Sequence, residues 1–307
     1  MASVTEQSAL IPVPTGVRVI ASDLDGTLLL PDGSVGARTR RALDELRDSD
    51  TDLVIVTGRP PRWISPIVEM TGHRGIGIGA NGGVVLDLAD GQVLEVFSLD
   101  PDTALEVIDR LRHALPGAVF AVERSRPGAR LAPTEGAAYD RLDSLPTDPT
   151  EFALGDGYRP RWPVPADTHI APIEELVRFG DVIKILVRPG DDVSFNNDEF
   201  LSVGDDALAG LVEVTHSDPS DRLLEVSALG VSKATTLERV VARQGHGARE
   251  VISAGDAPND LPMLFWADTS YAVGNAHPAV LSAATHVLPT NADEGVAALI
   301  ETVLAQL

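Results

Sequence analysis

The sequence predicts an α/β fold with a Rossmann-like core, built on a parallel sheet and interrupted by an inserted α+β domain. Both ends of the chain alternate short, apolar, β-branched runs with segments of helical periodicity, as parallel α/β proteins do. The middle of the chain instead mixes hairpin patterns with helices. We therefore expect residues 1–85 and 227–307 to form the core domain and residues 86–226 to form the inserted domain.

Composition narrows the possible functions. The 307 residues are 44% hydrophobic and 23% charged, as in ordinary globular proteins, and no apolar run approaches the length of a bilayer span. The net charge of −22 disfavours nucleic acid or an anionic membrane as a partner. Residues 1–15 lack the basic and apolar regions of a signal peptide, and the chain has no cysteine. We expect a cytoplasmic protein without disulfides or thiolate metal sites.

The first expected strand, residues 17–20, leads into two aspartates. Asp23 and Asp25 stand one residue apart, and Gly26 allows the chain to turn away sharply. Groups just past the carboxyl ends of parallel strands are well placed to bind ligands. Two neighbouring carboxylates repel each other unless a cation offsets their charge, and Mg²⁺ prefers such oxygen ligands. Taken alone, the same residues are equally typical of an ordinary turn after a strand.

A helix over residues 35–47, with Ser34 as its N-cap, should lead to a second buried strand at residues 53–56. That strand ends in Thr57 and Gly58. A threonine hydroxyl, together with backbone N–H groups freed by a glycine, can donate hydrogen bonds to a phosphate. The alternative is an ordinary threonine at a strand end, which this feature by itself does not exclude.

The next elements follow from local patterns. Asn81-Gly82 is a strong turn signal, and Asp100 followed by proline is typical of a helix start. Residues 124–168 are rich in Pro, Gly and Asp and stay unassigned. We expect helices at 63–70, 101–115 and 172–179, a hairpin over 84–97, and strands at 75–80, 119–123, 182–187, 208–214 and 222–226.

The core resumes with a helix that begins at Lys233 and has Ser232 as its expected N-cap. A lysine in a first helical turn is unfavourable with respect to the helix dipole, so either a bound phosphate requires it or it is simply solvated. A strand over residues 250–254 then ends in the polar residues Asp256, Asn259 and Asp260. Helices at 261–266 and 296–307 and strands at 269–273 and 287–288 complete the chain.

Together, these strand ends make the sequence resemble the haloacid dehalogenase (HAD) superfamily. More narrowly, it is similar to the Cof-type phosphatases of subfamily IIB, which carry a C2-type α/β cap after the second motif. The likeness covers the whole core, whereas the cap matches in position and length only. The residues that carry it are Asp23-Leu24-Asp25-Gly26-Thr27-Leu28, Val56-Thr57-Gly58-Arg59, Asn81-Gly82, Val231-Ser232-Lys233 and Gly255-Asp256-Ala257-Pro258-Asn259-Asp260-Leu261-Pro262-Met263.

The resemblance implies a role for each matching position. Asp23 is the expected nucleophile, forming an aspartyl-phosphate, and Asp25 the expected general acid and base. The expected Mg²⁺ ligands are Asp23, the backbone carbonyl of Asp25, and Asp256, with Asp260 supporting the metal or Lys233. The expected phosphate-binding residues are Thr57, Gly58, Lys233 and Asn259.

One position departs from the pattern. Many relatives have Asn directly after the Gly-Asp of the last motif, where this chain has Ala257 and Pro258. Ala257 offers no polar side chain, so the surroundings of the metal are expected to differ. Asp256, Asn259 and Asp260 keep their spacing, so we expect activity to be retained.

The sequence thus predicts a Mg²⁺-dependent phosphatase acting on small phosphate monoesters, such as sugar phosphates or similar metabolites. Two alternatives stay open: a phosphotransferase or sugar-phosphate mutase on the same scaffold, and a non-catalytic sensor of a phosphorylated ligand. The physiological substrate and the oligomeric state are not predicted. Trp162 is interpreted as core filler or a sugar-stacking platform, and the cap residues considered as contacts for the leaving group are Arg124, Arg126, Arg130, His169 and Lys184.

Overall fold

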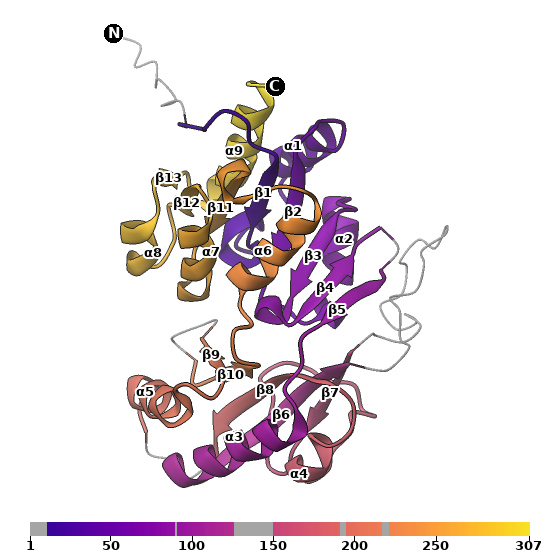
Figure 1. Cartoon of the computed structure of the whole chain (residues 1–307), viewed down its shortest axis with the longest axis vertical. Coiled ribbons are helices and arrows are strands. Elements are labelled where there is room, and N and C mark those ends of the chain that lie inside the picture. The colour runs from indigo at the N-terminus through magenta and orange to yellow at the C-terminus, as the bar shows by residue number, and fades with distance from the viewer. Residues whose placement is uncertain (1–10, 90, 126–149, 191–194, 217–220) are drawn as a thin grey trace.

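The computed structural model describes residues 11–89, 91–125, 150–190, 195–216 and 221–307. Two sheets organise the chain, and the larger one lies above the smaller one in Figure 1. The first and last parts of the sequence build the larger sheet, and the middle part builds the smaller one. This mixed α/β architecture, with a parallel-rich central sheet and a separate antiparallel sheet, confirms the predicted fold class. Arg126 and Arg130 lie outside the described residues.

In the described ranges, the larger sheet has eight strands, of which six run parallel from β13 to β3. Strands β4 and β5 extend it as an antiparallel hairpin. Parallel strands end at the same edge, so the polar residues that follow β1, β2 and β11 are brought together there. The strand order is β13 (His286–Leu288), β12 (Thr269–Val273), β11 (Val251–Gly255), β1 (Val19–Ser22), β2 (Asp52–Val56), β3 (Ile76–Gly79), β4 (Val84–Asp87) and β5 (Val93–Val96).

Helices cover both faces of this sheet, as the amphipathic patterns require. Leu43, Ile67 and Ile300 belong to the apolar cluster on one face, and Leu237 and Met263 belong to the cluster on the other. Burial on both faces explains why the central strands are nearly continuous apolar runs. The helices of this part are α1 (Ala37–Arg47), α2 (Ser65–Thr71), α6 (Lys233–Arg243), α7 (Leu261–Trp266), α8 (Pro278–Ala283) and α9 (Gly295–Leu304).

The smaller sheet is antiparallel, and the helices described in this part of the chain pack on one of its faces. Val107, Ile173 and Phe200, one from each helix, belong to a single apolar cluster with that face. The opposite face carries Leu186 and looks toward the larger sheet (Figure 1). Its strands are β7 (Thr150–Leu154), β6 (Ala118–Ser125), β8 (Val182–Pro189), β10 (Leu224–Ser227) and β9 (Glu213–Thr215), and its helices are α3 (Pro101–Ala114), α4 (Ile173–Leu176) and α5 (Asn197–Leu208).

The structure differs from the sequence-based expectations at three places. Strand β5 pairs with β4 in the larger sheet, although it lies inside the interval expected for the inserted domain. The expected strand at 208–214 is wrong over most of its length, because helix α5 extends to Leu208 and β9 begins at Glu213. Ser34 does not cap α1, which begins at Ala37; its hydroxyl donates a hydrogen bond to Asp32 instead.

Other local predictions are confirmed. Ser232 caps α6 and forms a capping box with Thr235, and Asp100 accepts hydrogen bonds from the first backbone N–H groups of α3. Within the described ranges, every helix is too short or too polar to cross a membrane.

Candidate active site

A cavity of about 210 Å³ lies between the carboxyl edge of the larger sheet and the facing side of the smaller sheet. Residues from both sheets line it, so the site is complete only when the two sheets face each other. The lining residues from the larger sheet and its connections are Asp23, Asp25, Thr57, Gly58, Arg59, Pro60, Arg62, Trp63, Lys233, Ala257 and Asn259. Those from the smaller sheet and its connections are Glu123, Trp162, Lys184, Leu186, Leu223 and Glu225.

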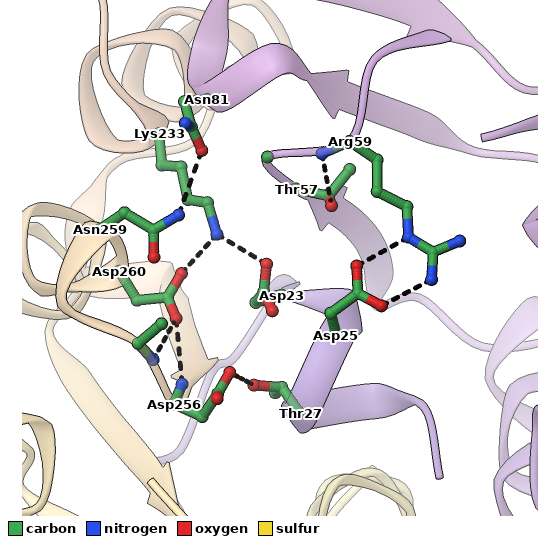
Figure 2. Close-up of polar contacts among 12 residues, drawn as sticks. Asp23, Asp25, Thr27, Thr57, Arg59, Asn81, Lys233, Asp256, Asn259 and Asp260 are labelled. Carbon is green, nitrogen blue, oxygen red and sulfur yellow. Dashed lines mark hydrogen bonds and ion pairs between the residues drawn. The ribbon is translucent and has the colours of Figure 1, made fainter. Parts of the chain in front are cut away.

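Lys233 is the centre of the polar network on the core side (Figure 2). Its Nζ donates hydrogen bonds to Asp23 Oδ1 and to Asp260 Oδ1, both at 2.6 Å, and all three side chains are buried. The Ser232 cap fixes the start of α6, and this start directs the lysine toward the end of β1. Burial opposes the charge on Lys233, but the two carboxylates outweigh it and raise the pKa of the ammonium.

The carboxylates of this network outnumber its cation. Burial raises the pKa of Asp23 well above its usual value, with Lys233 opposing the shift and Asp260 and Asp256 adding to it. Burial, together with Asp260, also raises the pKa of Asp256 to about 6. Three carboxylates around a single ammonium leave an excess of negative charge, which contributes to the raised pKa values of Asp23 and Asp256.

The same cluster fits a divalent cation. Asp23, Asp256 and Asp260 each offer a carboxylate oxygen, and these oxygens lie within 4.8 Å of one another. Both oxygens of Asp260 are already occupied, because Oδ1 accepts from Lys233 and Oδ2 accepts from the backbone N–H groups of Asp256 and Ala257 at 3.0 Å. Asp260 therefore supports the cluster, and Asp23 and Asp256 are the members whose oxygens remain for a divalent cation.

Asp256 is tightly held against the turn that follows β1. Its Oδ1 accepts a hydrogen bond from Thr27 Oγ1 at 2.8 Å. Gly26 has a φ of +77°, and a Cβ at this position would lie 2.4 Å from Asp256 Oδ2. Only glycine combines this backbone conformation with such a close approach, so the Asp-Gly-Thr sequence is needed for the carboxylates to converge.

Asp25 points to a different partner from Asp23 (Figure 2). Its carboxylate accepts two hydrogen bonds from Arg59, at 2.7 Å from Nε and 2.5 Å from Nη2. Thr57 lies beside this pair, and its hydroxyl accepts a hydrogen bond from the backbone N–H of Arg59 at 3.1 Å. The sequence reasoning assigned no role to Arg59, although it directly follows the Thr57-Gly58 pair that was singled out.

Asn259 is connected to the smaller sheet through Asn81. The Asn259 Nδ2 donates to Asn81 Oδ1 at 3.1 Å, and Asn81 Nδ2 donates to Thr215 Oγ1 at 2.9 Å. Asn81 is buried and adopts a left-handed conformation with a φ of +58°, which asparagine tolerates better than most residues. The Asn-Gly turn predicted from the sequence therefore also forms a polar bridge between the two sheets.

The smaller sheet contributes buried charges of its own. Lys184 Nζ donates to Glu225 Oε1 at 2.6 Å and to the backbone carbonyl of Gly58 at 3.2 Å. Arg62 reaches from the larger sheet and pairs with Glu123. Sequence analysis named Lys184 but missed Glu123, Glu225 and Arg62. For Glu123 and Glu225 the one available signal was a charged residue within a largely apolar strand, whereas Arg62 lies in the short helical turn Pro61–Trp63.

Aromatic side chains close the cavity on the same side. Trp162 packs edge-on against Trp63, with ring centroids 5.3 Å apart, and also contacts Phe152. Trp162 thus lines the cavity as well as filling space. Arg124 and His169, which were also considered as contacts for the leaving group, are absent from the described lining of the cavity. They contact each other instead, with Arg124 Nη2 at 2.9 Å from His169 Nδ1.

Comparisons with known proteins agree with this geometry. The haloacid dehalogenase-like hydrolase family matches residues 20–125 and 172–300. The pyridoxal phosphate phosphatase YbhA of Escherichia coli (strain K12) is 28% identical over 287 residues, covering 92% of this chain and 97% of that protein. The 5-amino-6-(5-phospho-D-ribitylamino)uracil phosphatase YcsE of Bacillus subtilis (strain 168) is 27% identical, covering 92% and 94%.

The fold comparison points the same way. The solved structure of BT1666 from Bacteroides thetaiotaomicron, one of the phosphatases of the haloalkanoate enzyme superfamily, matches with a TM-score of 0.72 and 21% identity. The match covers 98% of this chain and 100% of that one. The family match spans more than half of the chain and includes every strand end that supplies the cavity. This chain therefore belongs to the haloacid dehalogenase-like hydrolases and is an enzyme of that family.

Proposed function

We propose that the protein is a Mg²⁺-dependent phosphatase that hydrolyses small phosphate monoesters through an aspartyl-phosphate at Asp23. The two relatives described above are named for phosphatase activity on small phosphorylated molecules, which supports this substrate class. The observation that carries the proposal is the buried ammonium of Lys233, held by Asp23 and Asp260 beside the carboxylate of Asp256.

The residues suit a double displacement at phosphorus. A carboxylate oxygen of Asp23 attacks the phosphorus, the bond to the ester oxygen breaks, and Asp25 gives a proton to the departing alcohol. Water then attacks the phosphorus of the aspartyl-phosphate, the bond to Asp23 breaks, and Asp25 takes up the proton of the water. Mg²⁺ held by Asp23, Asp256 and the carbonyl of Asp25 would reduce the repulsion between carboxylate and phosphate.

The phosphoryl oxygens need donors on the side away from the metal. Lys233 supplies a fixed positive charge, and Thr57, Gly58 and Asn259 line the same wall of the cavity. Transfer of a phosphoryl group depends mainly on positioning and electrostatics, so these fixed groups suffice without further chemistry.

Two alternatives remain distinct from this proposal. A phosphotransferase or mutase would pass the phosphoryl group to a substrate hydroxyl and would release little free phosphate without an acceptor. A non-catalytic sensor would bind the ester without turning it over. Asp23, Asp25, Lys233 and Asp256 are all present, which favours an enzyme over a sensor.

Phosphate release from a panel of small phosphorylated metabolites tests the function directly. We expect wild-type protein to release phosphate from small monoesters in the presence of Mg²⁺ and to stop when the metal is chelated. Asp23→Asn should lower kcat by about 10⁴-fold, because it removes the nucleophile and keeps the shape of the side chain. Asp44→Asn, on the exposed side of α1, is the matched control and should leave the rate unchanged. Undiminished turnover in Asp23→Asn would exclude the mechanism.

A further inference from the structure

The chain contains two lysines, and both line the same cavity. Lys184 and Lys233 are the two lysines, whereas the chain has 22 arginines, so arginine is the usual cationic residue of this protein. Lysine differs from arginine in having a compact ammonium with three N–H donors on one atom. Lys233 lies on the core side, where the proposed function already uses it. Lys184 lies on the opposite wall and has no role in that mechanism.

Lys184 connects the cap, which is the smaller sheet with its helices, to the loop that follows β2. Its side chain is buried, and its Nζ donates to Glu225 within the cap and to the carbonyl of Gly58 in the core. Gly58 directly follows Thr57, so the contact reaches the loop proposed to bind phosphate. The two described partners account for two of the three ammonium donors, and the side chain borders the cavity.

The cap side of the cavity is electrically balanced. Glu123 lies opposite Lys184 in the pairing of β6 with β8, and Glu225 lies on the neighbouring strand β10. Arg62 pairs with Glu123, and Lys184 pairs with Glu225. Each of the four cations among the described lining residues has at least one carboxylate partner, namely Arg59–Asp25, Arg62–Glu123, Lys184–Glu225 and Lys233 with Asp23 and Asp260.

From this arrangement we infer that Lys184 determines specificity by donating its third N–H to an oxygen of the leaving group, while Glu123 and Glu225 exclude a second anionic group. The inference rests on the proposed phosphatase function. It names the substrate class as phosphate monoesters of neutral alcohols that carry a hydroxyl or carbonyl acceptor. A bisphosphate or a phosphorylated carboxylic acid would bring a second negative charge to a wall without an uncompensated cation.

The kinetic test compares three ester types. The panel supplies the best neutral, oxygen-bearing monoester, phenyl phosphate serves as an ester without such an acceptor, and fructose 1,6-bisphosphate serves as the doubly charged ester. Lys184→Met should lower kcat/KM for the oxygen-bearing ester by about 10- to 100-fold, mainly through KM, because a hydrogen bond to a charged donor is lost. The effect on phenyl phosphate should stay below about 3-fold.

Two further variants sharpen the kinetic test. Glu225→Gln leaves Lys184 without its carboxylate, so it should raise the turnover of the bisphosphate relative to the neutral ester by about 10-fold. Arg110→Met, an exposed change in α3, is the matched control and should alter no ester. An equal loss on all esters in Lys184→Met would show that Lys184 only holds the Gly58 loop, and an unchanged preference would also overturn the inference. A wild-type protein that prefers the bisphosphate would overturn it as well.

A readout independent of turnover uses the low lysine count. Wild-type protein labelled with ¹⁵N at lysine Nζ should give two side-chain NMR signals, and Lys184→Arg identifies which belongs to Lys184. Adding the free alcohol of the best ester should shift the Lys184 signal and leave the Lys233 signal in place. A Lys184 signal that does not move would overturn the inference. Failure of the phosphatase function itself is distinguished by absent Mg²⁺-dependent phosphate release from every ester, phenyl phosphate included.

Discussion

The two walls of the cavity use the same chemical groups for different purposes. On the core wall, three carboxylates surround one ammonium, and the excess negative charge favours a divalent cation. On the cap wall, Glu123 and Glu225 are matched by Arg62 and Lys184. The comparison teaches that the balance of charges differs between the walls: the core wall has an excess of carboxylates, whereas each of these two cap carboxylates has a cationic partner.

The two walls also differ in where the chain places their charges. On the core wall, Asp23 and Asp256 follow strand ends, and Lys233 begins a helix. On the cap wall, Lys184 and Glu225 lie inside strands, on the face that meets the core. Strand ends and helix starts leave backbone groups free for ligands, whereas residues inside a strand contribute only their side chains.

The largest effect is expected from removing the cation of the core wall. Lys233→Met leaves two buried carboxylates unpaired, so we expect a loss of about 3–5 kcal/mol in the free energy of unfolding and a loss of turnover beyond about 10³-fold. Urea unfolding and phosphate release measure the two quantities. Adding Asp260→Asn should restore part of the stability without restoring turnover. Full recovery of turnover in the double variant would contradict the role of Lys233.

A smaller effect is expected from removing one negative charge from the cap wall. Glu123→Gln keeps the shape of the side chain but leaves the Arg62 guanidinium without its carboxylate, so the cap and core should separate more readily. We expect KM for neutral esters to rise several-fold, with a loss of about 1–3 kcal/mol in the free energy of unfolding. Glu106→Gln, which removes an exposed pair within α3, is the control and should cost less than about 0.5 kcal/mol. Equal changes in KM and in the free energy of unfolding in the two variants would contradict a special role for the Glu123–Arg62 pair.

The last prediction separates the acid sensitivity of the fold from that of the site. Burial lowers the pKa of His73 from 6.5 to about 4, and its Nε2 is buried without a hydrogen-bond partner. Between these pH values the unfolded chain binds a proton that the folded chain does not. The contribution of His73 to stability is therefore complete above pH 6.5 and is lost as the pH falls toward 4.

We expect this histidine to account for up to roughly 3 kcal/mol of the acid-induced loss in the free energy of unfolding. His73→Asn should flatten the slope between these pH values, as measured by urea unfolding at several pH values. The exposed His113→Asn is the control. If Asp23→Asn and Lys233→Met flattened the slope in the same way, the acid sensitivity would belong to the cavity instead.

Much of the core could be predicted because its signals are local. The runs before Asp23, Thr57 and Asp256 are apolar and end in turn residues, and Ser232 is a recognisable cap for α6. Such patterns depend on hydrogen bonds within a few residues, so the sequence displays them directly. The cap wall was predicted less well, because Glu123 and Glu225 gain their roles only from partners on other strands.

The misassigned elements have the same cause. Helix α5 begins with a capping box at Asn196 and Glu199, yet the apolar residues at 208–214 also fit a strand. Residues 209–212 form a turn, and only Glu213–Thr215 finds a strand partner, in β10, so pairing with a distant segment decided how much of this run became a strand. The pairing of β5 with the larger sheet likewise depends on β4, which connects it to β3.

The sequence by itself determined the alternation of strands and helices, the strand ends that carry Asp23, Thr57 and Asp256, and the family likeness. Only the tertiary structure decided that Arg59 holds Asp25, that Asn81 connects Asn259 to Thr215, and that Lys184 reaches the Gly58 loop. The physical reason is range: caps, turns and periodicity act between neighbours in sequence, whereas an ion pair forms wherever folding brings two opposite charges within a few ångströms.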